Sequence, residues 1–213
     1  MPNHRHCGDC TLCCRLVPVE SLDKPAGTRC KHQTRHGCAC YADLEVVAPD
    51  CRLWNCRWLV DPDATGLRRP DHAHYVIDIM PDFIGVQDDT GRVEDIAVMQ
   101  VWCDPDYPDA WRDQALRRYA ERMAAERHEA ILVRFGAARA IAVIPPSMSI
   151  DGKWQEKESH MNRGDDTGWT NPLDAMRRHG GLRRGPDGAF TLDRARLRET
   201  ADRALALLGG QRP

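Results

Sequence analysis

Ten cysteines are the residues of this sequence best suited to chemistry, and nine of them lie within its first 56 residues. The run opens with Cys7-Gly8-Asp9-Cys10-Thr11-Leu12-Cys13-Cys14. Two residues between cysteines allow a tight turn to direct both sulfurs towards one ion, as in zinc knuckles and iron–sulfur loops. Because side chains of adjacent residues diverge, we expect one of Cys13 and Cys14 to ligate a first metal. The other would serve a second site or pack nearby.

The compartment decides whether dense cysteines form disulfides or bind metal. The N-terminus has no apolar stretch that could act as a secretory signal, and no apolar run is long enough to span a bilayer. These features predict a cytoplasmic protein, in which thiols stay reduced. Cysteines in such proteins are more often metal ligands or redox groups than disulfides, so we expect metal.

The last two cysteines of the run, Cys51 and Cys56, are five positions apart. In a regular helix their side chains would stand about 140° apart around the axis and could not both face one ion. Either the helix starts after Cys51, or the two cysteines are ligands of different metal sites.

Four blocks of the segment resemble a known family: Cys7 to Cys14, Lys24 to Cys30, Gly37-Cys38 with Tyr41, and Cys51 to Leu59. Together they resemble the YkgJ-type cysteine-cluster proteins. Proteins of this family are described as zinc- or iron-chelating, and some are thought to carry an iron–sulfur cluster. The resemblance covers only the N-terminal part of the chain.

Carried over residue by residue, the resemblance implies a set of eight metal ligands. These are Cys7, Cys10, Cys13, Cys14, Cys30, Cys38, Cys51 and Cys56. The chain departs from the family pattern in two places. Cys40 stands where the family usually has an apolar residue, and Val47-Ala48-Pro49-Asp50 replaces the Arg-Pro pair that often precedes the penultimate cysteine.

The kind of metal is a separate question. Eight thiolates can build two four-cysteine zinc sites, one four-iron cluster with spare cysteines, or one site of each kind. All-thiolate ligation suits both metals, and spacing alone does not separate them. The adjacent pair and the irregular later spacings differ from paired zinc ribbons, which favours an iron–sulfur cluster over zinc.

Other residues of the segment have plainer interpretations. Trp54 and Trp58 would share one helical face, packing in the core and shielding the cluster from water. Cys103 follows an apolar strand and is expected to be a buried, inert thiol. Since one site needs fewer ligands than the cysteines supply, we expect the nearby histidines to be solvated. These are His4, His6, His32 and His36.

The composition of the chain changes along its length and indicates which parts position the cysteines. Residues 1–60 form a cysteine-cluster metal-binding segment that is rich in turns and has few large apolar side chains, so metal would supply much of its stability. Residues 61–73 form a polar connector. Residues 71–213 are predicted to form an α+β domain with C-terminal helices.

From residue 75 onwards the sequence pattern predicts two strands, then a helix, then two more strands. Apolar runs at 75–80, continued at 83–87, and at 93–102 flank a turn at 88–91. A helix capped by Asp109 would run to about Arg127, followed by strands at 131–135 and 140–144. This order indicates a small antiparallel sheet with helices, on which the cysteine-rich segment packs. Residues 151–171 are expected to be a loop, with helices at 172–179 and after Asp193.

The sequence contains no catalytic signature for phosphate binding, dinucleotide binding or hydrolysis. We expect a metal-binding protein that carries an iron–sulfur cluster with a redox, sensing or metal-handling role. One alternative is structural zinc, with a C-terminal part that binds a partner protein. Another is an iron–sulfur enzyme whose substrate the sequence does not reveal. The net charge of -2 gives no reason to expect nucleic acid or a membrane as partner.

Overall fold

The structure is a computed structural model of the chain. It describes residues 5–87, 93–137, 139–159, 182–184 and 190–192. The chain forms two compact units, of which one is Asn3–Gly168 and the other joins Met1–Pro2 to Trp169–Pro213. In the second unit, β8 (Leu182–Arg184) pairs antiparallel with β9 (Phe190–Leu192). The predicted division into residues 1–60 and 71–213 stays a prediction.

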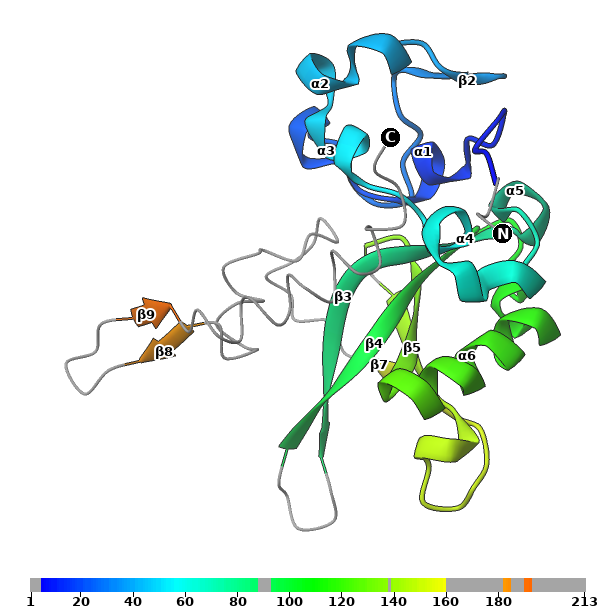
Figure 1. Ribbon diagram of the computed structural model, residues 1–213, viewed down its shortest axis with the longest axis vertical. Coiled ribbons are helices and arrows are strands. Elements are labelled where there is room, and N and C mark those ends of the chain that lie inside the picture. Colours follow the sequence, from blue (N-terminus) through cyan, green and yellow to red (C-terminus); the bar gives the residue numbers. More distant parts are fainter. Residues whose placement is uncertain (1–4, 88–92, 138, 160–181, 185–189, 193–213) are drawn as a thin grey trace. The chain divides into compact units, whose positions relative to one another are not determined.

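The unit Asn3–Gly168 is built on one mixed sheet of five strands in the order β3-β4-β5-β6-β7 (Figure 1). The strands are β3 (Tyr75–Gln87), β4 (Val93–Cys103), β5 (Glu129–Phe135), β6 (Arg139–Ile144) and β7 (Gln155–Ser159). These are the expected strands with slightly shifted ends and one addition. The α+β class is confirmed.

One pairing corrects the predicted antiparallel sheet, because β4 and β5 are parallel neighbours. The other three neighbouring pairs of this sheet are antiparallel. The reason is the long helix α6 (Gln114–Arg127), which lies between β4 and β5 in the chain. A helix carries the chain back across the sheet, so the next strand starts at the same end as the last one.

The start of that helix also differs from the prediction. The N-cap of α6 is Asp113, whose side chain accepts a hydrogen bond from the Ala115 N–H. Asp109 instead precedes a short 3-10 helix, η4 (Ala110–Arg112). Two aspartates four residues apart both satisfy the cap pattern, and the longer amphipathic run begins only after the second.

The predicted loop at 151–171 contains the edge strand β7, which pairs antiparallel with β6. This strand was not predicted because its sequence, Gln155 to Ser159, is polar, and an edge strand needs no apolar face of its own. Residues 151–154 of that loop form a turn before β7, whereas 160–171, the turn at 88–91 and the helices at 172–179 and after Asp193 lie outside the described residues.

The cysteine-rich segment consists of short elements joined by turns. They are α1 (Leu12–Leu16), η1 (Glu20–Leu22), β1 (Gln33–Thr34), β2 (Gly37–Cys38), η2 (Tyr41–Asp43), α2 (Leu44–Val47), α3 (Pro49–Leu53) and α4 (Arg57–Val60). The predicted connector contains η3 (Pro62–Gly66) and α5 (Pro70–Ala73). Among the described residues no helix is long and apolar enough to cross a membrane.

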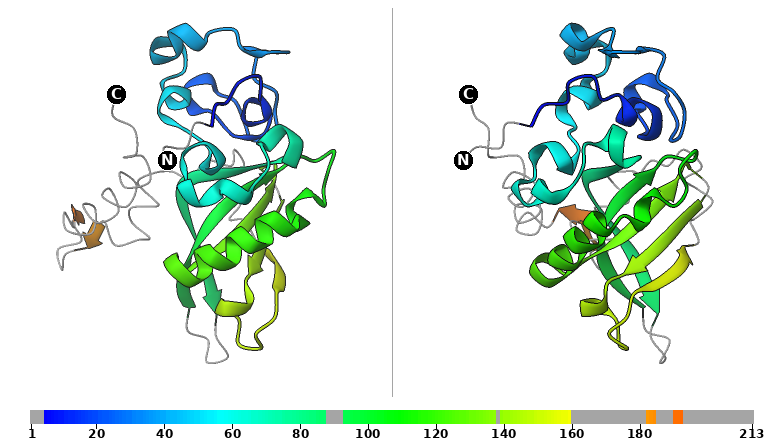
Figure 2. Two further views of the ribbon diagram at one scale, coloured as in Figure 1. Left: turned by 45° about the vertical axis from the view of Figure 1, so that its right-hand side comes forward. Right: turned by 90° about the vertical axis from the view of Figure 1, so that its right-hand side faces the viewer.

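The two faces of the sheet bury different parts of the chain. Figure 2 shows α6 along one face, where the strands contribute Tyr75, Ile77, Met99 and Val101 among others. The alternate residues Val76 and Trp102 face the other side and pack against the cysteine-rich segment. Side chains alternate along a strand, so consecutive strand residues serve the two layers in turn. Packing of the cysteine-rich segment on the sheet is thus observed.

Truncation of the α6 layer gives a direct measure of this packing. Leu116 lies on the buried face of α6, so Leu116→Ala should lower the free energy of unfolding by about 2–5 kcal/mol. Urea denaturation followed by circular dichroism measures the change. Ile150→Ala is the matched control, because Ile150 is fully exposed and its loss should change stability by no more than about 0.5 kcal/mol. Equal effects of the two variants would contradict the assignment of the core.

Candidate metal centre

The cysteine motif at the N-terminus begins as a turn and ends in a short helix. The Cys10 N–H donates to the Cys7 carbonyl at 3.1 Å, and Gly8 has a φ of 59° that favours glycine. Cys13 and Cys14 lie in the following helix α1, whose buried residues are Leu12 and Leu16. Successive helical side chains point about 100° apart, yet the Cys13 and Cys14 thiols still interact with each other.

Cys13 belongs with the cysteines of the opening turn and with Cys56. The pKa of the Cys13 thiol is raised first by its hydrogen bond with Cys14, then by burial, with Cys7 and Cys56 adding to the shift. Burial raises the pKa of Cys56 to about 12, and Cys7 and Cys10 contribute as neighbouring charges. We call these four residues the first thiol set: Cys7, Cys10, Cys13 and Cys56.

Cys14 interacts with Cys7 and Cys13 and also has neighbours in a second group of cysteines. Burial raises the pKa of Cys51 to about 11, with further contributions from Cys14, Cys30 and Cys38 as neighbouring charges. The Cys30 N–H also donates to the Cys14 carbonyl at 2.8 Å, which fixes the two chain segments side by side. We call these four residues the second thiol set: Cys14, Cys30, Cys38 and Cys51.

Our grouping places Cys51 and Cys56 in different sets, which is one of the two alternatives drawn from the sequence; that they serve different sites stays a prediction. Helix α3 ends at Leu53, Trp54 is extended, and α4 begins only at Arg57. The break allows the chain to turn between the two cysteines. It also corrects the idea that Trp54 and Trp58 share one helical face, although both pack against the layer between the segment and the sheet.

The electrostatics favour a thiolate at Cys14. The hydrogen bond with Cys13 lowers the pKa of Cys14 to about 7. Lys24 adds to this effect, and its own pKa is lowered by burial and raised by nearby thiols of both sets. Its ammonium group is held in place by donating to the Val17 carbonyl. A buried cation beside thiols stabilises their charged form, which is the form that binds metal.

Cys40 and Cys103 are the two cysteines outside the predicted ligand set. The Sγ atoms of Cys38 and Cys40 are 3.5 Å apart, so Cys40 lies beside the second thiol set. Cys103 is buried in the layer beneath α6, on the face opposite the cysteine-rich segment. Burial raises its pKa to about 11, as expected for an inert thiol.

Three of the four nearby histidines lie within the described residues. His6 and His36 are exposed, in line with the expectation that they are solvated. His32 is half-buried, and its Nε2 atom is buried without a hydrogen-bond partner in the described part of the chain. The backbone N–H of His32 donates to the Cys30 Sγ at 3.4 Å. His4 lies outside the described residues.

The cysteine-rich segment is fastened to the sheet at Asp78, a residue that the sequence reading missed. The Asp78 carboxylate accepts hydrogen bonds from the indoles of Trp54 at 2.7 Å and Trp102 at 3.0 Å. The backbone of Asp78 forms an isolated antiparallel bridge with Cys56. Burial raises the pKa of Asp78, whereas these donors lower it. The sequence feature that could have identified Asp78 is its position as the single carboxylate within the apolar run Tyr75–Met80.

A second fastening follows directly after Cys56. Arg57 is buried, and its guanidinium group forms a bidentate ion pair with Glu129 at the start of β5, one bond of which measures 2.7 Å. The Arg57 Nε also donates to the Asp78 carbonyl at 2.9 Å. Bidentate pairing fixes orientation as well as distance. The position of the Cys56 backbone is therefore set by two strands of the sheet.

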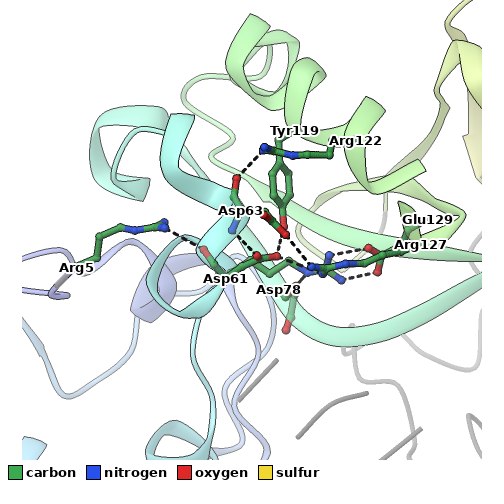
Figure 3. Close-up of polar contacts among 9 residues, drawn as sticks. Arg5, Asp61, Asp63, Asp78, Tyr119, Arg122, Arg127 and Glu129 are labelled. Atoms are coloured by element: carbon green, nitrogen blue, oxygen red, sulfur yellow. Dashed lines mark hydrogen bonds and ion pairs between the residues drawn. The ribbon is translucent and has the colours of Figure 1, made fainter. Parts of the chain in front are cut away.

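A third group of polar contacts joins the N-terminus to α6 (Figure 3). The buried Asp61 carboxylate accepts from the Tyr119 hydroxyl at 2.6 Å and from Arg127 at 3.3 Å. Arg5, two residues before Cys7, donates to the Asp61 carbonyl at 2.9 Å and to the Trp58 carbonyl. Both ends of the first thiol set are thus anchored, one through Arg5 and the other through Arg57.

Within the described residues, no group of three or more His, Cys, Asp or Glu side chains converges closely enough to hold an ion as it stands. Comparisons with models of protein families, with curated proteins and with solved structures give no match. The resemblance to YkgJ-type proteins therefore rests on the motif residues and stays a prediction.

The ion pair between Arg57 and Glu129 yields a test of this architecture. Arg57→Met should lower the free energy of unfolding by about 3–5 kcal/mol, because the Glu129 carboxylate is left buried without its cation. Urea denaturation measures the loss. The double variant Arg57→Met, Glu129→Leu removes both charges and should recover most of it. A double variant as unstable as the sum of the two single variants would show that the pair is not the source of the effect.

Proposed function

We propose that the cysteine-rich segment binds metal through eight thiolates arranged as two sets of four, and that it carries an iron–sulfur cluster with a redox, sensing or metal-handling role. The observation that carries the proposal is the backbone path, which brings Cys30 beside Cys14 through a hydrogen bond and holds Cys56 on the sheet through its bridge with Asp78. We assign the eight cysteines to two sets on this basis. Four thiolates complete the coordination of a zinc ion or of an iron–sulfur cluster.

The spacing within the first thiol set supports the iron–sulfur assignment. Cys7, Cys10 and Cys13 follow one another with two residues between them, and Cys56 joins them from a distant part of the chain. Three closely spaced cysteines with a remote fourth ligand are typical of bacterial ferredoxin clusters. The neighbouring Trp54 and Trp58 are partly buried against this layer, where apolar cover would limit the access of water and influence the potential of a bound cluster.

The second thiol set is also suited to structural zinc. Its four cysteines come from α1, the loop before β1, β2 and α3. Residues 20–53 are all described, and their buried apolar residues besides Cys30 are Ala26, Leu44 and Ala48. So small a core gives little stability by itself, and a metal ion that links the four elements would supply what is missing. One site of each kind is therefore our assignment for the two sets.

Residues of this chain would prepare each set for its ion. Lys24 is buried beside thiols of both sets and favours their charged form. Asp78 and Arg57 hold the backbone at Cys56, the only ligand of the first set that comes from outside the opening motif. Binding would require the thiol side chains to turn towards the ion.

Metal analysis tests the proposal directly. Protein purified without oxygen should contain iron, acid-labile sulfide and zinc and should absorb visible light. Stoichiometric zinc with no iron and no redox-active signal would favour the alternative of structural zinc, with a C-terminal part that binds a partner protein. Colourless protein with neither metal would overturn the proposal. An enzyme that uses the cluster would need a coordination position not filled by cysteine.

Single cysteine variants test the division into two sets. Cys10→Ser should abolish iron and sulfide and leave zinc, because Cys10 belongs to the first set. Cys30→Ser should lower zinc and leave the visible spectrum. Inductively coupled plasma mass spectrometry and a sulfide assay measure these contents. Cys103→Ser is the matched control, since Cys103 lies on the opposite face of the sheet, and it should change neither. Loss of both metals in every variant, Cys103→Ser included, would refute the assignment of ligands.

A further inference from the structure

An open groove lies on the cysteine-rich segment beside the second thiol set. It has a volume of about 450 Å³, and its lining includes Thr11, Arg15, Arg29, Gln33, Thr34 and Arg35. Three of these side chains carry a positive charge, and no acidic residue lines the groove within the described chain. The volume falls in the range of small-molecule sites, about 300–1,000 Å³.

The charge of the groove is only partly balanced. Arg15 is held by Asp104 at 3.1 Å and Asp106 at 2.7 Å, which fixes its position and neutralises most of its charge. Arg29 and Arg35 are exposed and make no ion pair or hydrogen bond to the side chains of the described residues. Like charges near one another repel, and an anion placed between them relieves that repulsion.

The frame of the groove is fixed by contacts within the segment. The Gln33 side-chain amide donates to the Thr11 hydroxyl at 2.8 Å and so ties β1 to the start of α1. Gly27, which also lines the groove, has a φ of 73°, and a Cβ there would meet the Gly136 Cα at 3.3 Å. Arg15 follows Cys14 and Arg29 precedes Cys30, whose backbones are hydrogen-bonded. The arginines are therefore carried by the part of the chain that the second thiol set holds.

We propose that this groove binds a small ligand through a phosphate group. The guanidinium group presents a planar fork of donors that matches the oxygens of phosphate, and the forks of Arg29 and Arg35 have no side-chain partner in the part of the chain that the structure describes. The Thr11 hydroxyl lines the same surface and, among the described residues, only accepts, from Gln33, so its own hydrogen can be donated to a phosphate oxygen. A protein interface would engage about 20–30 residues a side, many more than line this groove, so a small ligand fits better than an acidic protein segment. The inference goes beyond metal binding, because the groove is framed by the Gln33–Thr11 and Cys30–Cys14 hydrogen bonds of the chain itself.

Chemical modification of arginine can locate the anion. The purified full chain is treated with phenylglyoxal, and the modified arginines are quantified by peptide mass spectrometry, with inorganic phosphate or with chloride at equal ionic strength. Saturating phosphate should slow the modification of Arg29 and Arg35 at least about fivefold, because an occupied site shields its arginines. Arg118 is exposed on α6 and does not line the groove, so it serves as an internal reference and should react at an unchanged rate.

Variants and competing anions complete the test. In Arg35→Gln the protection of Arg29 by phosphate should be lost, while Arg118→Gln should leave it intact. Metal content measured on the same samples separates loss of the groove from loss of the segment's fold. Equal protection of Arg118, or no protection of Arg29 and Arg35, would overturn the proposal. So would protection by succinate or by a polyglutamate peptide where phosphate gives none.

Discussion

The structure depends on the attachment of a segment with little core of its own to a sheet that has a large one. Asp78 is the centre of that attachment. Its carboxylate accepts from one indole of the segment, Trp54, and from one indole of the sheet, Trp102, while its backbone pairs with Cys56. A buried carboxylate is costly unless its oxygens are satisfied, and here the donors that satisfy it come from both layers. Correct docking is therefore the condition under which Asp78 can be buried.

Most of the sheet was predictable because its residues follow simple periodic patterns. The strands at β3, β4, β5 and β6 have apolar runs, and α6 has an apolar face at helical spacing. What the sequence did not yield was the direction of pairing, since β4 and β5 become parallel neighbours through a helix whose path no local pattern specifies. The polar edge strand β7 was missed for a related reason, because its pairing comes from β6 and not from its own composition.

Some features of the candidate site could also be predicted from the sequence, and others could not. Cysteine spacing singled out the segment, and the adjacency of Cys13 and Cys14 predicted that they serve different sites, which stays a prediction. The membership of each set could not be read from spacing, because Cys56 reaches the opening motif only through contacts with the sheet. The role of Lys24 could not be predicted either, since nothing in the sequence around a single loop lysine indicates that folding buries it beside thiols.

The ion pair between Arg57 and Glu129 also has a consequence for the order of biosynthesis. A ribosome makes the chain from its N-terminus, so every cysteine of residues 7–56 emerges before the strands on which the segment packs. The contact that positions the backbone after Cys56 cannot form until residue 129 has been made. The thiol of Cys56 thus spends much of translation without its final neighbours on the sheet, exposed to oxidation until β5 has been made and the sheet has closed.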